Sequence, residues 1–243
     1  MYRLNLSDGY DNYSQRKSKI KHIQKGQYGT NKIDWTNTCN VHSMAMAFLY
    51  SGWVWPKSTM EREPDALGQF IIDDSLKSDS YYATHFPVMW KNWFEGDPNA
   101  YSPLEVHAVL AHETNKFFGC TKAVIFNEQQ QLREYFSDIY YKRTCKPTSM
   151  TFGKYGHIIC VVGFEATSQQ EVIDYLSGKS VCPITKVIFD DPYGKCKDFS
   201  MGIYEQSGGN DNIISINDFV KYSKPLGKNL VMCHTISKPV AVV

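Results

Sequence analysis

Cys39 stands where a polar stretch gives way to a helical pattern. Apolar residues recur behind it at helical spacing, at Val41, Met44, Ala45, Phe48 and Leu49. This pattern predicts a helix with one buried face. Asn37 and Thr38 are good capping residues, which puts the helix start at or beside Cys39. A thiol there meets unpaired backbone N–H groups and the positive end of the helix dipole. That environment favours the nucleophilic thiolate and offers donors to an oxyanion.

A cysteine nucleophile needs a base and a third group that orients the base. His157 opens an apolar, β-branched run to Phe164, which is typical of a strand buried on both faces. Asp191 directly follows a second strand pattern at 186–190. If these strands pair antiparallel, the histidine at the start of one neighbours the aspartate at the end of the next. Asp191 would accept a hydrogen bond from one ring nitrogen of His157, and the other nitrogen would face the thiol.

Each of these three residues also has a purely structural interpretation. Most free cysteines are inert packing in a core. A histidine at a strand end is commonly just hydrogen bonded to its neighbours, and an aspartate before proline commonly forms a turn. Residue type, order and spacing leave both interpretations open.

Composition excludes several classes of protein. A chain of 243 residues with 42% hydrophobic content can bury a substantial core, and it shows no repeat or linker, so one domain over 1–243 is expected. A net charge of +1 gives no general attraction to nucleic acid. No apolar run approaches the roughly 20 residues of a membrane span. Residues 1–8 lack the apolar core of a signal peptide, so cytoplasmic synthesis is expected, and any action on a cell wall would need separate release.

No cofactor or metal is expected from the motifs. The seven cysteines are irregularly spaced without a C-x-x-C pair, which argues against a disulfide framework and against structural zinc. His107 and His112 are five residues apart and do not form an H-E-x-x-H pair, so a zinc hydrolase is not favoured. Asp8 and Asp11 do not fit an EF-hand loop and are interpreted as turn residues.

The remaining patterns predict the elements that position these side chains. Further helices are expected over 103–112, 128–141, 169–176 and 215–222. Strands are expected over 121–126, 157–164, 186–190 and 229–236. Residues 1–38 are polar and carry no assigned element, and residues 195–212 are expected to be mainly loop.

Three segments, in order, resemble motifs of one peptidase family. Thr38–Met46 resembles the nucleophile motif of the C39-like branch of the papain-like cysteine peptidases. Gly156–Gly163 resembles the Gly-His strand of that family, and Asp190–Gly194 resembles its Asn-Asp-Pro-Tyr-Gly turn. Upstream, Tyr13–Arg16 is similar to its Tyr-x-Gln segment.

The resemblance implies a fold and a set of roles. The fold would be α+β and papain-like, with the nucleophile helix packed against an antiparallel sheet. Cys39 would be the nucleophile, His157 the base and Asp191 the orienting carboxylate. The glutamine of the upstream segment, Gln15, would help to form the oxyanion hole, and Asn37 is a second candidate for that donor.

The family includes leader-peptide peptidases fused to transporters and stand-alone cell-wall hydrolases, several of them from phages. Because the sequence contains no transporter segment, the resemblance favours a phage-type endolysin that cleaves peptidoglycan peptides. Two alternatives stay open. One is an intracellular protein or leader-peptide peptidase, and the other is a catalytically idle binding protein on a papain-like scaffold.

Overall fold

The computed structural model describes residues 1–10, 13, 39–50, 77–85, 87–88, 91, 122–124, 129–142, 146–152, 157–198, 203–205, 208–223 and 231–233. Its helices are α2 (Cys39–Tyr50), α4 (Tyr81–His85), α7 (Gln129–Lys142), α8 (Gln169–Leu176) and α9 (Ile216–Tyr222). Its strands are β1 (Tyr2–Asn5), β2 (Lys122–Val124), β3 (Lys146–Phe152), β4 (His157–Ala166), β5 (Ile184–Asp190), β6 (Lys195–Asp198), β7 (Ile203–Glu205), β8 (Asn212–Ser215) and β9 (Val231–Cys233). None of these helices is long and apolar enough to cross a membrane.

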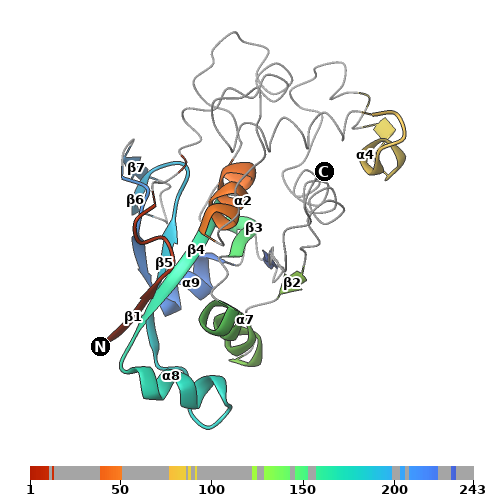
Figure 1. Cartoon of the computed structure of the whole chain (residues 1–243). Helices are drawn as coiled ribbons and strands as arrows, with labels where there is room; N and C mark the ends of the chain where they lie inside the picture. The colour runs from red at the N-terminus through yellow and green to blue at the C-terminus, as the bar shows by residue number, and fades with distance from the viewer. Residues whose placement is uncertain are drawn as a thin grey trace.

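An antiparallel sheet forms the centre of the described part of the chain (Figure 1). Its strand order is β2-β9-β3-β4-β5-β8, and β1 pairs with β4 beside this path. Strands β6 and β7 form a separate two-stranded hairpin. The expected combination of helices with an antiparallel sheet is therefore confirmed as an α+β architecture.

Strand β4 is the middle of this sheet. It pairs with β5 along one edge, and along the other edge it pairs first with β3 and then with β1. Every residue of β4 after His157 is buried, as the apolar run predicts. Helix α2 packs against β3 and β4 and lies toward the end at which β4 begins (Figure 1).

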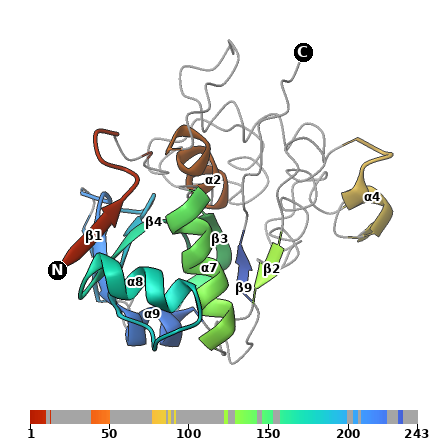
Figure 2. The same ribbon diagram turned by 60° about the horizontal axis from the view of Figure 1, so that its bottom comes forward.

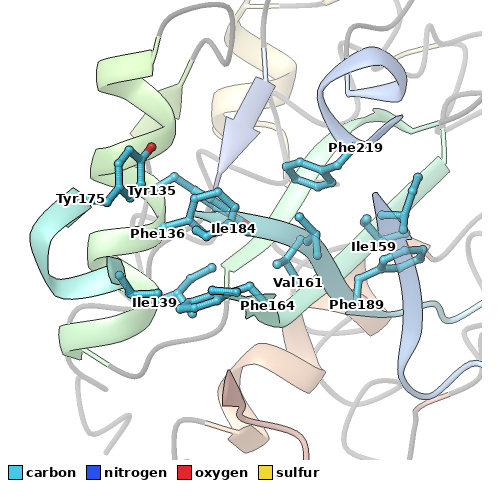
Figure 3. Packing of buried hydrophobic residues seen from close by; sticks show 14 residues of the cluster. Tyr135, Phe136, Ile139, Ile159, Val161, Phe164, Tyr175, Ile184, Phe189 and Phe219 are labelled. Carbon is cyan, nitrogen blue, oxygen red and sulfur yellow. The ribbon is translucent and has the colours of Figure 1, made fainter. Parts of the chain in front are cut away.

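A hydrophobic cluster joins helices α7, α8 and α9 to the sheet (Figure 3), and the ribbons of these three helices are seen together in Figure 2. Its largest fully buried side chains are Tyr135, Phe136, Phe164, Tyr175, Phe189 and Phe219. The rings of Phe136 and Phe164 meet edge to face, with their centroids 5.6 Å apart, and this contact holds α7 on β4. Burying one such ring stabilises the fold by about 1.5–3 kcal/mol, so this cluster gives β4 and β5 a rigid support.

Most local patterns identify their elements correctly. Helix α8 has the bounds that the sequence predicts, because Ser168 accepts a hydrogen bond from the N–H of Glu171 and caps it. The expected helices near 128–141 and 215–222 are confirmed as α7 and α9. The expected strands near 121–126 and 229–236 are confirmed in their central residues as β2 and β9. The helix expected over 103–112 lies outside the described residues.

The prediction of loop within 195–212 is confirmed for residues 208–211 and is wrong for residues 195–198 and 203–205. This segment contains the β6–β7 hairpin and the first residue of β8. Strand β6 has the sequence Lys-Cys-Lys-Asp, which lacks the alternating apolar residues that indicate a strand. Strand β1 was not predicted either, because its four residues stand in a polar context and gain their structure from pairing with β4.

Gly163 allows β1 to approach β4 closely. A Cβ atom at this position would lie 1.9 Å from the carbonyl oxygen of Leu4 and 2.8 Å from its carbonyl carbon. Both atoms belong to the backbone, so no change of rotamer can relieve the overlap. The register of β4 against β5 also shifts between Val161 and Gly163, which indicates a bulge at this point.

We expect Gly163→Ala to lower the free energy of unfolding by about 3 kcal/mol, because β1 must move away from β4. Urea unfolding measures the loss. The control is Gly9→Ala, where a Cβ meets nothing within 4 Å and only the positive φ of 88° adds a cost. That cost is about 1 kcal/mol. Equal losses in the two variants would contradict the close approach.

Candidate active site

Helix α2 begins at Cys39, as the sequence predicts. The cysteine is buried, with 7% of its surface exposed. The backbone N–H groups of the first helical turn have no acceptor within the helix and carry its positive dipole end. Cys39 therefore combines a buried thiol with nearby N–H donors. The expected capping residues, Asn37 and Thr38, lie outside the described residues.

The pairing of β4 with β5 brings His157 and Asp191 together. Cys160 pairs with Asp190 in this antiparallel ladder, so Asp191 follows on the side where β4 begins. His157 and Asp191 are then diagonal neighbours, close enough for an imidazole to reach a carboxylate. The Nε2 atom of His157 lies 2.5 Å from Oδ1 of Asp191. The antiparallel pairing that the sequence required of these two strands is confirmed.

The carboxylate of Asp191 is fixed by its own turn. Its Oδ1 atom also accepts a hydrogen bond from the N–H of Tyr193 at 2.8 Å, and its own N–H donates to the carbonyl of Gly209 at 2.8 Å. The N–H of Gly194 donates to the carbonyl of Asp191 and closes the turn, and Gly194 has a positive φ of 130°. Asp191 is fully buried, so its direction is set by these bonds and not by solvent.

The imidazole of His157 links this carboxylate to the thiol. The Cys39 side chain lies within hydrogen-bonding reach of His157. Because Nε2 is bound to Asp191, Nδ1 is the ring nitrogen that remains for the thiol. The edge of the Tyr193 ring packs against the imidazole, with ring centroids 5.8 Å apart. Only 12% of the His157 side chain is exposed, so the contacting side chains of Cys39, His157 and Asp191 are largely buried.

The environment of His157 favours its charged form. Burial of the imidazole opposes protonation, but the charge and the hydrogen bond of Asp191, followed by those of Cys39, outweigh it. Together they raise the pKa of His157 to about 10. His157 therefore carries a proton at neutral pH.

A second buried carboxylate, Asp190, lies beside this line, and the sequence analysis did not identify it. The hydroxyl of Tyr50, the last residue of α2, donates to Oδ2 of Asp190 at 2.5 Å. The N–H of Asp211 donates to Oδ1 of Asp190 at 2.8 Å. Burial raises the pKa of Asp190 to about 6, although these two hydrogen bonds oppose the shift. The Asp190-Asp191 doublet at a strand end was the available signal in the sequence.

The loop before β8 is held by the chain around β1. Asp211 has a left-handed backbone, with φ 52°, which is unusual for a residue other than glycine. Its Oδ1 accepts hydrogen bonds from Nδ2 of Asn5 at 2.9 Å and from the hydroxyl of Ser7 at 3.1 Å. These bonds fix the segment whose Gly209 carbonyl binds Asp191.

A second polar contact ties α2 to β4. The hydroxyl of Ser43, one turn after Cys39, donates to the carbonyl of Ile158 at 3.0 Å. Both residues are buried, and Ile158 directly follows His157. This contact also escaped the sequence analysis, because a serine within an apolar helical pattern does not reveal its partner.

The remaining expectations for the site concern oxyanion donors and metals. Gln15 and Asn37, the two candidates for an oxyanion donor, lie outside the described residues. Within the described ranges, no group of three or more His, Cys, Asp or Glu side chains is arranged to hold a metal ion. Cys160, the cysteine nearest to the site in sequence, is fully buried in β4.

A thiol, an imidazole and a buried carboxylate in contact can move a proton away from sulfur and return it to a leaving group. The same order of groups supports covalent catalysis of acyl transfer. No family model matches the chain, and no curated protein or solved structure matches it either. The chemistry of the site is therefore argued from its geometry and from the sequence motifs.

We expect Asp191→Asn to lower the pKa of His157 from about 10 toward its ordinary value of 6.5, because burial is then no longer outweighed by a carboxylate. NMR titration of the imidazole signals measures the change. A His157 signal that still titrates near 10 in the variant would contradict the role of the Asp191 charge.

The same shift predicts how stability depends on pH. A pKa raised in the folded state adds stability that is fully present below the unfolded value of 6.5 and is lost as the pH rises through about 10. The difference in free energy of unfolding between the wild type and Asp191→Asn should therefore shrink over this range. Urea unfolding at several pH values measures it, and a difference that grows with pH would refute the assignment.

Proposed function

We propose that the chain is a papain-like, C39-like cysteine peptidase or amidohydrolase that cleaves an amide bond. The observation that carries this proposal is the continuous contact from the Cys39 thiol through the His157 imidazole to the Asp191 carboxylate. The buried helix start at Cys39 and the packing of α2 against antiparallel strands support the papain-like assignment. The order of the three sequence motifs supports it independently.

In the first half of the proposed reaction, Cys39 is the thiolate and His157 the imidazolium. The sulfur attacks the carbonyl carbon of the amide and forms a tetrahedral intermediate. The carbon–nitrogen bond then breaks while the proton of His157 passes from Nδ1 to the leaving amine. The products of this half are a free amine and a thioester on Cys39. Asp191 holds the ring in place and stabilises its positive charge before the proton leaves.

In the second half, the neutral His157 takes a proton from water. The hydroxide that this transfer leaves attacks the thioester carbon, and the carbon–sulfur bond breaks. A carboxylic acid leaves, and the thiolate–imidazolium pair is restored. The backbone N–H of Cys39, with the side chain of Gln15 or Asn37, would stabilise the oxyanion in both halves.

For the substrate, we infer a peptide amide of peptidoglycan. This inference depends on the resemblance to stand-alone cell-wall hydrolases, which act on short peptides cross-linked into a polymer. An intracellular protein or leader-peptide peptidase would use the same three side chains. A direct comparison separates these classes: loss of turbidity of purified cell walls against cleavage of casein, with products identified by mass spectrometry. Cell walls are the expected substrate, and cleavage of casein alone would replace the endolysin-like assignment.

We expect Cys39→Ala to reduce hydrolysis by about a million-fold, to the background rate, because no other group replaces the nucleophile. Asp191→Ala should leave a residual rate about a thousand-fold below that of the wild type, because Asp191 only orients and stabilises the imidazole. The matched control is Cys182→Ala, a partly exposed free cysteine that should leave the rate unchanged. Full hydrolytic activity in Cys39→Ala would end the proposal.

We expect iodoacetamide to alkylate Cys39 faster than Cys182 and Cys196 at about pH 7, since an adjacent imidazolium favours the reactive thiolate. The last two cysteines are partly exposed, whereas Cys39 is buried, so accessibility alone predicts the opposite order. Timed labelling followed by peptide mapping gives the three rates. If Cys39 reacts no faster than the other two, the site is idle and the chain is a binding protein at most.

A further inference from the structure

Two buried side-chain hydrogen bonds connect α2 to the strands, and each ends beside a member of the proposed triad. Ser43 donates to the carbonyl of Ile158, the residue after His157. Tyr50 donates to the carboxylate of Asp190, the residue before Asp191. The helix that begins with Cys39 is thus tied to the immediate neighbours of both of its proposed partners.

The spacing along α2 places these ties on the face that carries Cys39. Ser43 is four residues after Cys39 and Tyr50 is seven after Ser43, so successive offsets around the helix are only about 40° and 20°. The two ties are about 10 Å apart along the helix axis. Two separated points of attachment on one face restrict both rotation of the helix and sliding along its axis.

The described apolar side chains of α2 between the two ties are less directional than these hydrogen bonds. Among the side chains that the structure describes between the two ties, the buried apolar ones are Met44, Ala45, Met46 and Ala47. Methionine is flexible and adapts to several packings, and alanine offers little shape. Apolar contact is also non-directional, so such a surface tolerates small shifts of the helix. Directional hydrogen bonds are what specify one position.

The hydrogen bonds from Tyr50 and from Asp211 together favour a carboxylate at position 190, because each donor binds a different oxygen. Oδ2 of Asp190 accepts a hydrogen bond from the Tyr50 hydroxyl, and Oδ1 accepts one from the N–H of Asp211. An asparagine has only one acceptor oxygen, so it cannot satisfy both donors. A second carboxylate is therefore buried directly beside Asp191, and it takes no part in the proposed reaction.

We propose that Ser43 and the Tyr50–Asp190 pair are positioning residues that fix the register of α2 against β4 and β5, and with it the separation of Cys39 from His157. This inference rests on the proposed function. Displacing a nucleophile by about 1 Å can cost about 100-fold in rate, so a small shift of α2 is enough to matter. Substrate binding does not depend on this separation, and KM should therefore change little.

The test compares Ser43→Ala, Tyr50→Phe and the double variant in the full chain. Matched controls are Ser180→Ala, whose hydroxyl donates to the carbonyl of Val181, and Tyr141→Phe on the exposed face of α7. Two quantities are measured: kcat and KM on purified cell walls, or on casein if the walls are not cleaved, and the rate of alkylation of Cys39 by iodoacetamide.

We expect each single variant to lower kcat about tenfold with KM within about twofold, and the double variant to lose about a hundred-fold. Ser43→Thr keeps the hydroxyl and should restore most of the loss in Ser43→Ala. The alkylation rate of Cys39 should fall in the same order. Folded variants that keep the wild-type kcat and alkylation rate would overturn the inference.

The outcomes distinguish the inference from the function on which it rests. An active wild type with unaffected variants removes only the positioning role. A wild type that cleaves neither substrate, and whose Cys39 reacts slowly, removes the proposed function and the positioning role with it. A purely structural effect would lower the folded fraction but leave kcat per folded molecule unchanged, which also overturns the inference. If Tyr50→Phe does not fold, Ser43→Ala and its Ser43→Thr rescue decide the question alone.

Discussion

The antiparallel pairing of β4 with β5 is the constraint on which the candidate site depends. It sets Asp190 opposite Cys160 and thereby brings Asp191 to the imidazole of His157. A slip of one residue would turn every side chain of β5 to the other face and exchange the directions of Asp190 and Asp191. Val187 and Phe189 of β5 belong to the hydrophobic cluster, so such a slip would also turn these two side chains out of it. The hydrophobic cluster and the site therefore enforce the same register.

Two adjacent aspartates are buried at the end of β5, and the fold treats them differently. Asp191 faces a histidine that becomes a cation, so its negative charge is balanced and the pKa of His157 rises. Asp190 receives neutral donors from Tyr50 and Asp211, and burial raises its own pKa. Removing a carboxylate from water is costly unless its oxygens are satisfied. This requirement explains why Tyr50 at the end of α2, Asp211 before β8 and Ser7 after β1 all supply hydrogen bonds to Asp190.

Local patterns were sufficient for the elements whose sequence alone determines their form. The apolar spacing after Cys39 and the capping serine before α8 are of this kind, and so are the apolar runs of β4 and β5. Cys39, His157 and Asp191 could also be selected, because each stands at the boundary of such an element.

The hydrogen bonds that tie α2 to the strands could not be predicted in this way. Tyr50 and Asp190 are 140 residues apart, and Ser43 and Ile158 are 115 apart. Their partners follow from the tertiary arrangement, as do β1 and β6, whose strand form comes from a neighbour. The roles of Gln15 and Asn37 stay predictions.

The contact of Asn5 with Asp211 spans 206 positions of the chain. A ribosome makes the first partner long before the second exists, so this closure must wait until residue 211 has been made. Contacts between such distant positions also form slowly, because a long loop must close first. The thiol is likewise made before the imidazole and the carboxylate that would activate it. A nascent chain that stops short of residue 191 thus holds the sulfur without its proton relay, and under the proposed chemistry it is inert toward the polypeptides around it.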